Sequence, residues 1–146
     1  VADGPGGGLV VNADVARSVG LDATQVEQLA EPERAELTRR RSRYLGDRAP
    51  EKVAGRRAVV VDDGIATGAT ARAVLQALRA AGAGEVILAV PVAPSDTLEA
   101  LRPLADAVIC LETPSPFFAV GAHYRSFGQV SDDEAIAVLD AARAGR

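Results

Sequence analysis

Two adjacent carboxylates, Asp62 and Asp63, directly follow an apolar run at residues 58–61 and precede a turn built from small residues. Burying two acids side by side is costly unless hydroxyls, amides or a cation meet them. The residues after them are small or carry a hydroxyl group: Gly64, Ala66, Thr67, Gly68, Ala69 and Thr70. Small residues allow close backbone approach, and a helix that starts here points unpaired N–H groups outward. Sugar hydroxyls for the carboxylates and a phosphate for the loop describe one ligand, a ribose 5-phosphate.

An alternation of strands and helices must hold these residues in place. The apolar runs at 58–61, 85–92 and 107–111 predict strands, with helices between them at 69–81 and 95–104. The continuous β-branched run of the first strand indicates burial on both faces of a parallel sheet. This order is typical of right-handed βαβ units, so the predicted fold class is α/β, a parallel sheet flanked by helices. The two acids then lie at the carboxyl edge of the sheet, where open α/β folds bind ligands.

The chain divides by pattern into two regions. Residues 1–55 are expected to form a small accessory, hood-like helical region, and residues 56–146 the core with a C-terminal helix. Ser131 and Glu134 have the spacing of a capping box, which predicts where that last helix begins.

The first region is expected to contain a short strand at 9–11 and a helix at 13–19. Asp22 and Gln25 form a second capping box, which opens a longer helix. Pro32 within that helix predicts a kink or a break.

The segment from Val59 to Thr70 resembles the diphosphoribosyl-binding motif of type I phosphoribosyltransferases. It contains an apolar strand, two acids, and a small-residue loop with Thr67-Gly68 and a further threonine. The match is contiguous, which makes it more specific than a lone glycine pattern. It extends more loosely over 57–111, and 117–132 is similar to a bacterial subgroup of such enzymes with poorly defined substrates. The alternative, an acid pair and glycine turn that merely link a strand to a helix, is the weaker interpretation.

The resemblance implies a chemistry for these residues. The family transfers phosphoribosyl from 5-phosphoribosyl 1-diphosphate (PRPP) to a nitrogen base, usually a nucleobase, and releases pyrophosphate with the help of Mg²⁺. By this resemblance Asp62 and Asp63 are the catalytic pair and contact the ribose hydroxyls, while Gly64 and residues 66–70 complete the phosphate-binding loop. The Mg²⁺ ion would be bound mainly through the substrate, so no protein residue is assigned as a metal ligand.

Three aromatic residues follow the third strand, near the sheet edge that would hold a base: Phe117, Phe118 and Tyr124. Each is a candidate for stacking on a nucleobase-like acceptor. Packing into the core is the alternative for each of them.

Two other functions stay open: a non-catalytic sensor of PRPP or nucleotides, and an accessory domain of a multifunctional protein. The sequence has no methionine and begins Val1-Ala2, so we expect a piece of a longer protein that lacks its N-terminal part. The pyrophosphate-binding loop of the family lies upstream of the acid pair. Only Gly4–Gly8 could supply such a loop here, so we expect this chain alone to have little activity.

Length, charge and composition exclude several classes of function. With 146 residues, 48% of them hydrophobic, the chain can bury one ordinary core. A formal net charge of −4 argues against a nucleic-acid partner, and no apolar run is long enough to cross a membrane. The single cysteine excludes an internal disulfide and suits a cytoplasmic location. A homodimer is compatible with the sequence.

Other chemically capable residues carry weaker signals. The basic cluster Arg39–Arg43 could face pyrophosphate or RNA, but a solvated helix end is the favoured interpretation. His123 has no evident catalytic partner and is interpreted as an ordinary loop residue. Cys110 lies within an apolar strand and is interpreted as a small buried hydrophobe.

Overall fold

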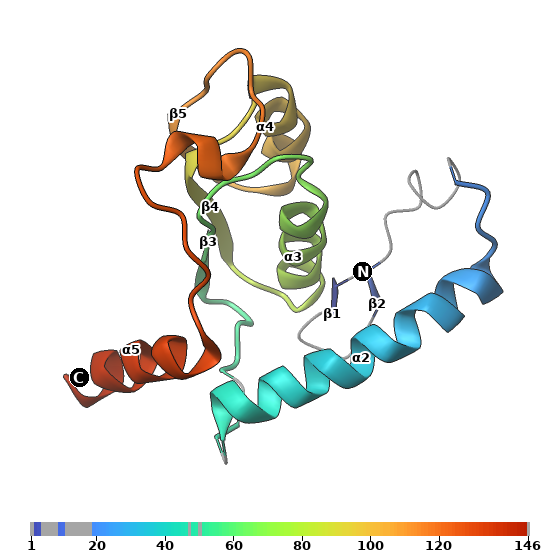
Figure 1. Ribbon diagram of the computed structural model, residues 1–146. Helices are drawn as coiled ribbons and strands as arrows, with labels where there is room; N and C mark the ends of the chain where they lie inside the picture. Colours follow the sequence, from blue (N-terminus) through green and yellow to red (C-terminus); the bar gives the residue numbers. More distant parts are fainter. Residues whose placement is uncertain (1, 4–8, 11–18, 47, 50, 146) are drawn as a thin grey trace.

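The computed structural model describes residues 2–3, 9–10, 19–46, 48–49 and 51–145. Figure 1 shows a small sheet with helices on one side and a long helix beneath it. Residues 113–145, which follow the last strand, form a C-terminal arm. The described elements, in chain order, are β1 (Ala2–Asp3), β2 (Leu9–Val10), α2 (Ala23–Leu45), β3 (Arg57–Val61), α3 (Ala69–Ala80), β4 (Glu85–Val92), α4 (Ser95–Leu101), the 3₁₀ turn η1 (Arg102–Leu104), β5 (Ala107–Glu112), the 3₁₀ turn η2 (Val120–His123) and α5 (Asp132–Ala144).

The predicted parallel sheet is confirmed. Its three strands lie in the order β3-β4-β5, and both neighbouring pairs are parallel. Val60 pairs with Leu88 and Val90 pairs with Cys110, so the strands advance together toward one carboxyl edge. Helices α3 and α4 follow the first two strands, as the βαβ pattern requires.

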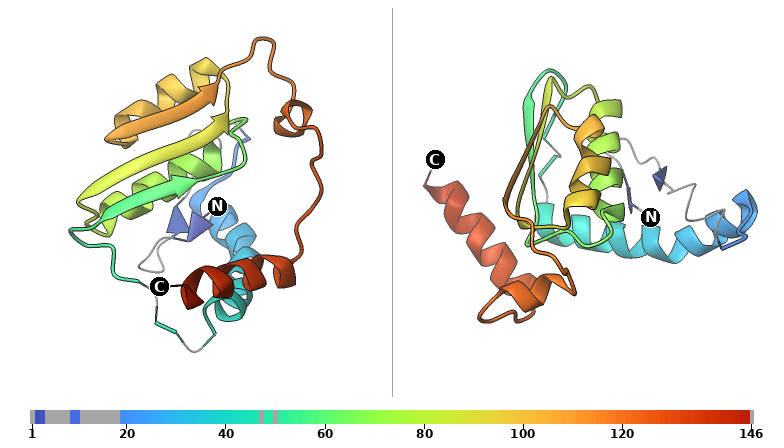
Figure 2. Two further views of the ribbon diagram at one scale, coloured as in Figure 1. Left: turned by 90° about the vertical axis from the view of Figure 1, so that its left-hand side faces the viewer. Right: turned by 90° about the horizontal axis from the view of Figure 1, so that it is seen from above.

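One face of the sheet holds the hydrophobic core. Figure 2 shows α3 and α4 side by side on this face. The alternate residues of β4 point into the core, and Leu88 is fully buried there with Leu75 of α3 and Leu101 of α4. Val60 of β3 packs against the same cluster. This packing fixes the end of β3 from which the acid pair emerges.

The prediction that β3 is buried on both faces is wrong for the described chain. Val59 and Val61 are 54% and 73% exposed, and on β5 Ile109 and Leu111 are also exposed. These side chains share the sheet face opposite α3 and α4, which no described helix covers. The apolar run therefore reflects two faces, of which the described elements bury only one. Parallel sheets are usually covered on both.

The N-terminal part has one long helix and one small hairpin. Asp22 caps α2 through the predicted capping box with Gln25. Pro32 lies within a continuous helix, so the predicted break is absent. The hairpin of β1 and β2 lies against α3. The helix predicted at 13–19 falls outside the described residues except for its last residue.

The C-terminal helix begins as predicted. Ser131 and Glu134 form the expected capping box of α5. Arg43 of α2 forms ion pairs with Asp132 and Asp133 at 2.9 and 2.7 Å, and these hold the end of α2 beside the start of α5. None of the helices that the structure describes has the length and apolar composition needed to cross a bilayer.

Candidate functional site

Asp62 and the small-residue turn surround one cavity at the carboxyl edge of the sheet. Its volume is about 220 Å³. It is lined by Asp62, Gly64, Ile65, Ala66, Thr67, Gly68, Ala69, Thr70, Ala71 and Val120. The structure thus brings together the predicted phosphate-binding residues and one of the two predicted acids. Val120 is an addition from the C-terminal arm that the sequence did not indicate.

Two glycines make the turn possible through close contact. A Cβ atom on Gly64 would lie 2.6 Å from a methyl carbon of Val120. A Cβ atom on Gly68 would lie 2.8 Å from the Thr97 methyl carbon, and Gly68 has φ +75°, a conformation that glycine adopts without strain. Both positions require glycine for reasons that the folded structure makes explicit.

Thr97 of α4 contacts the small-residue turn at two points. Its hydroxyl donates a hydrogen bond of 3.0 Å to the carbonyl oxygen of Ala66, while its methyl group touches the site of Gly68. One side chain therefore fixes the backbone on both sides of Thr67. Sequence reasoning missed this residue because nothing local marks a threonine that contacts a turn 31 residues earlier.

The N-terminus of α3 opens on the same cavity. Gly68 is its N-cap residue, and no side chain caps the first turn. The first N–H groups of an uncapped helix have no partner within the helix, and the helix dipole adds partial positive charge there. Ala69, Thr70 and Ala71 lie in this first turn and line the cavity. Such an arrangement favours an anion.

The carboxylates lack cationic partners among the described residues. The ion pairs of this part of the chain involve neither Asp62 nor Asp63. Asp62 accepts a hydrogen bond of 2.9 Å from the N–H of Asp63. Partial burial raises the pKa of Asp62, and the adjacent charge of Asp63 acts in the same direction. A donor or cation supplied by a ligand would relieve this cost.

Of the three aromatic candidates, Tyr124 lies beside the acid pair. Its hydroxyl donates a hydrogen bond to the main-chain oxygen of Asp63, and its ring lies 5.2 Å from that of Phe127. Phe117 stacks on His123 with ring centroids 5.2 Å apart. Phe118 is 83% exposed. The structure therefore does not bring the three aromatic residues together.

The structure also shows the surroundings of the basic cluster and of Cys110, for which the sequence favours no functional role. Glu36 binds both Arg39 and Arg40, which lowers the pKa of Glu36 to about 2, and Arg43 binds α5, so these arginines are engaged within the protein. Cys110 is half-buried against the core, and its thiol lies 3.1 Å from the carbonyl oxygen of Glu112.

A comparison of the whole chain decides what kind of domain holds this site. The model of the phosphoribosyl transferase domain family matches residues 5–126. The chain belongs to this family. The resemblance of residues 59–70 is thereby confirmed at the level of the domain.

Curated phosphoribosyl transferase relatives cover nearly the full chain. Proteins from Mycobacterium tuberculosis strains CDC 1551 and H37Rv, named "Putative phosphoribosyl transferase" MT0597 and Rv0571c, are each 49% identical over 141 residues. The alignment covers 97% of this chain and 32% of each relative, so the chain spans about a third of their length.

A solved structure shares the fold. The crystal structure of TT1426 from Thermus thermophilus is 39% identical in sequence, with a TM-score of 0.77. The similarity covers 92% of this chain and 63% of that one. The predicted fold class of the phosphoribosyl transferase domain is thus confirmed by the described sheet and by this likeness.

The donor set can be tested against the Mg²⁺ ion that the family implies. The described residues contain no group of three or more metal-ligating side chains. Mg²⁺ keeps several waters and is commonly held by one or two carboxylates together with substrate phosphates. Asp62 and Asp63 beside an anion-favouring turn fit that mode of binding.

Proposed function

We propose that the cavity at the carboxyl edge binds the ribose 5-phosphate part of PRPP, for transfer of phosphoribosyl to a nitrogen base. One observation carries the proposal: a carboxylate that has no cationic partner among the described residues lines the same cavity as an uncapped helix N-terminus. Carboxylates accept hydrogen bonds from sugar hydroxyls, and helix N–H groups donate to phosphate. At about 220 Å³ the cavity suits a sugar phosphate better than a whole nucleotide, since nucleotide-sized sites usually exceed about 300 Å³.

The residues would act on the reaction through position and charge. The bond from the sugar C1 to diphosphate oxygen breaks, and its electron pair leaves with pyrophosphate. The nitrogen lone pair of the base forms the new bond to C1, and any proton lost from that nitrogen goes to water. In the transition state the ribosyl group has oxocarbenium character, so nearby carboxylates stabilise it. Asp62 and Asp63 would hold the hydroxyls and the residues at 66–70 the 5-phosphate. Bound Mg²⁺ would neutralise charge on the leaving group, with Asp62 and Asp63 as its protein ligands.

Tyr124 marks the side on which an acceptor base would enter. Its hydroxyl is engaged with Asp63, and its ring and that of Phe127 form a tilted pair next to the acids. Aromatic rings at this edge can contact a planar acceptor. We propose a nucleobase-like compound as the acceptor class, with Tyr124 as its nearest aromatic contact.

Isothermal titration with ribose 5-phosphate tests the proposal. Asp62→Asn and Asp63→Asn should each weaken binding about tenfold or more, because charge-assisted hydrogen bonds contribute about 1.5–3 kcal/mol. Asp62→Asn should leave thermal stability equal or higher, because it removes a partly buried charge that lacks a cation. Asp133→Asn on α5 is the matched control and should bind normally. Unchanged affinity in both site variants would rule out the ribose assignment.

A further inference from the structure

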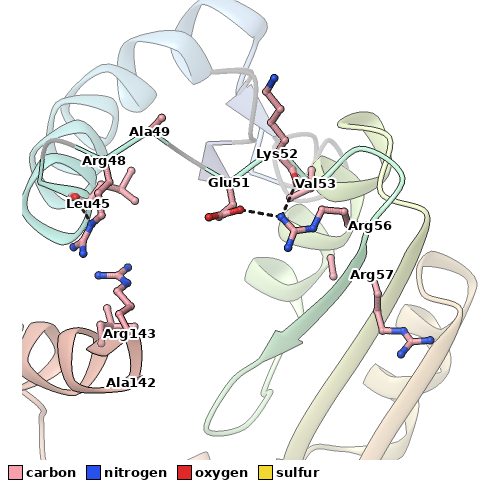
Figure 3. A pocket seen from close by; sticks show the side chains of 12 residues that line it. Leu45, Arg48, Ala49, Glu51, Lys52, Val53, Arg56, Arg57, Ala142 and Arg143 are labelled. Carbon is pink, nitrogen blue, oxygen red and sulfur yellow. Dashed lines mark hydrogen bonds and ion pairs between the residues drawn. The ribbon is translucent and has the colours of Figure 1, made fainter. Parts of the chain in front are cut away.

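A second, larger cavity lies at the opposite edge of the sheet. Its volume is about 780 Å³. Figure 3 shows that its walls come from the end of α2, the connector before β3, the start of β3 and the last turns of α5. The polar lining residues are Arg48, Glu51, Lys52, Arg56, Arg57 and Arg143. The family resemblance assigns no role to this cavity.

Positive charge dominates the lining. Five of the six charged lining residues are basic, and Glu51 is the acidic one. Arg48 and Arg143 reach one shared carboxylate, Asp140, at 3.4 and 3.2 Å. In Figure 3 these two guanidinium groups lie near one another across the gap between α2 and α5. At this wall of the cavity, two of the described cations therefore share one carboxylate.

The other three basic residues that line the cavity also have few acidic partners. Arg56 pairs with Glu51 at 2.8 Å, and Arg57 pairs with Glu85 of β4. The ammonium group of Lys52 forms no ion pair with another described residue. Among the described residues, the five lining cations therefore have three carboxylate partners in all. Guanidinium groups bind phosphate oxygens through two parallel hydrogen bonds, so such an excess favours a phosphate-bearing anion.

The same cavity also has an apolar part. Leu45, Val53, Ala58, Leu139 and Ala142 line it beside the basic residues. Its volume lies within the range of sites that enclose cofactor-sized organic molecules. We propose that this cavity binds an organic polyphosphate of nucleotide size, with its phosphates on Arg48, Arg56 and Arg143 and its organic part on the apolar wall.

This ligand would be distinct from the sugar phosphate at the other edge. Arg57 and Ala58 begin β3, whereas Asp62 follows its end. Five residues of strand span roughly 16 Å at about 3.3 Å each. One phosphoribosyl diphosphate cannot occupy both places, so the basic cavity is not the pyrophosphate subsite of the first cavity. The two ligands would bind opposite ends of one strand.

Titration of the 146-residue chain with ATP, and separately with inorganic triphosphate, tests the proposal. The Gly68→Ala background disables the turn at the first cavity, so that ATP bound there does not contribute. We expect one ATP site in this background, with affinity at least tenfold above that for triphosphate. Binding should weaken as salt rises, because screening reduces the attraction between exposed charges.

Variants of the lining locate the site. The double variant Arg56→Gln/Arg143→Gln should weaken ATP binding at least tenfold, and Lys52→Glu severalfold. Lys52→Glu removes no ion pair between described residues, so it should fold normally. It therefore tests the site even if the double variant fails to fold. Arg102→Gln on η1 is the matched control. Absent ATP binding, equal binding of triphosphate, or affinity unchanged in Lys52→Glu and the double variant would each overturn the proposal.

Discussion

The hydroxyl of Tyr124 donates a hydrogen bond to the main-chain oxygen of Asp63, a residue 61 positions earlier in the chain. This bond joins the C-terminal arm to the turn that carries both acids. Val120 on the same arm packs against Gly64 within that turn. The arm therefore positions the acid pair rather than merely passing over the edge of the sheet.

Tyr124→Phe should weaken binding of ribose 5-phosphate about two- to tenfold. The change removes one hydrogen bond, which contributes about 0.5–1.5 kcal/mol, and keeps the ring that pairs with Phe127. Isothermal titration measures the affinity, and the thermal unfolding temperature should fall by no more than a few degrees.

The chain supplies a matched control for this variant. Tyr44, the other tyrosine, donates its hydroxyl at 2.8 Å to Asp132, away from the turn. Tyr44→Phe should leave ribose 5-phosphate affinity unchanged. Equal loss of affinity in both variants would show that Tyr124 has no specific role at the acids.

Gly68→Ala should abolish measurable binding of ribose 5-phosphate. The added Cβ meets the Thr97 methyl at 2.8 Å and Leu101 at 3.3 Å, and φ is +75°, so the turn must move. Titration of a chain shown by circular dichroism to be folded measures the effect.

Gly20→Ala separates backbone strain from crowding. Gly20 has φ +73°, but a Cβ there would meet nothing within 4 Å. This control should lose a small amount of stability through backbone strain alone and keep its affinity for ribose 5-phosphate. Normal binding by Gly68→Ala would contradict the placement of the phosphate in this turn.

Much of the fold could be predicted because its signals are local. The capping boxes at Asp22 and Ser131 and the apolar strands each depend on residues within a few positions. The uncovered face at Val59 and Val61 could not be predicted, because the same apolar run fits a strand covered on one face or two. Pro32 likewise indicates strain without deciding whether the helix ends.

The candidate site was predictable only in its contiguous part. Asp62 and residues 64–70 are nearly contiguous in sequence and line one cavity, whereas Asp63 lies beside it and accepts a hydrogen bond at its main-chain oxygen. Thr97 and Tyr124 act on this turn from 31 and 61 residues away, so only the folded chain shows their contacts. The sequence predicts Tyr124 as a candidate for stacking on a base, and the structure also gives its hydroxyl a positioning contact with Asp63.

Asp106 should make stability depend on pH in acid. Its carboxylate accepts a hydrogen bond of 2.7 Å from the N–H of Val86 and pairs with Arg79 at 2.8 Å. The hydrogen bond from Arg79 is the main cause that lowers the pKa of Asp106 in the folded chain. An acid whose pKa is lower when folded stabilises the fold above its unfolded pKa, about 3.9. This contribution is lost as pH falls through the lowered value.

Asp106→Asn should therefore be less stable than the original chain at pH 7, and the difference should shrink as pH approaches 3. Urea unfolding at both pH values measures this. Glu99→Gln, a change on an exposed residue of α4, should show no such convergence. A stability difference independent of pH would rule out the ion pair with Arg79 as its cause.

The last prediction concerns turnover. In the described structure the carboxyl edge offers one turn built for phosphate, at residues 66–70, and PRPP carries a 5-phosphate and a diphosphate. In the basic cluster of α2, Arg39 and Arg40 are bound to Glu36 and Arg43 is bound to α5, so these three arginines are engaged within the protein. The chain spans about a third of the length of its curated relatives, so turnover is compared with that of a longer version of the protein. We expect the 146-residue chain to bind ribose 5-phosphate yet release little pyrophosphate from PRPP with Mg²⁺ and a panel of nucleobases. The longer version should release it readily, and its Asp62→Asn variant should not.

Fast release by the short chain would place a pyrophosphate subsite within these residues. Binding without release by either version would favour a sensor over an enzyme.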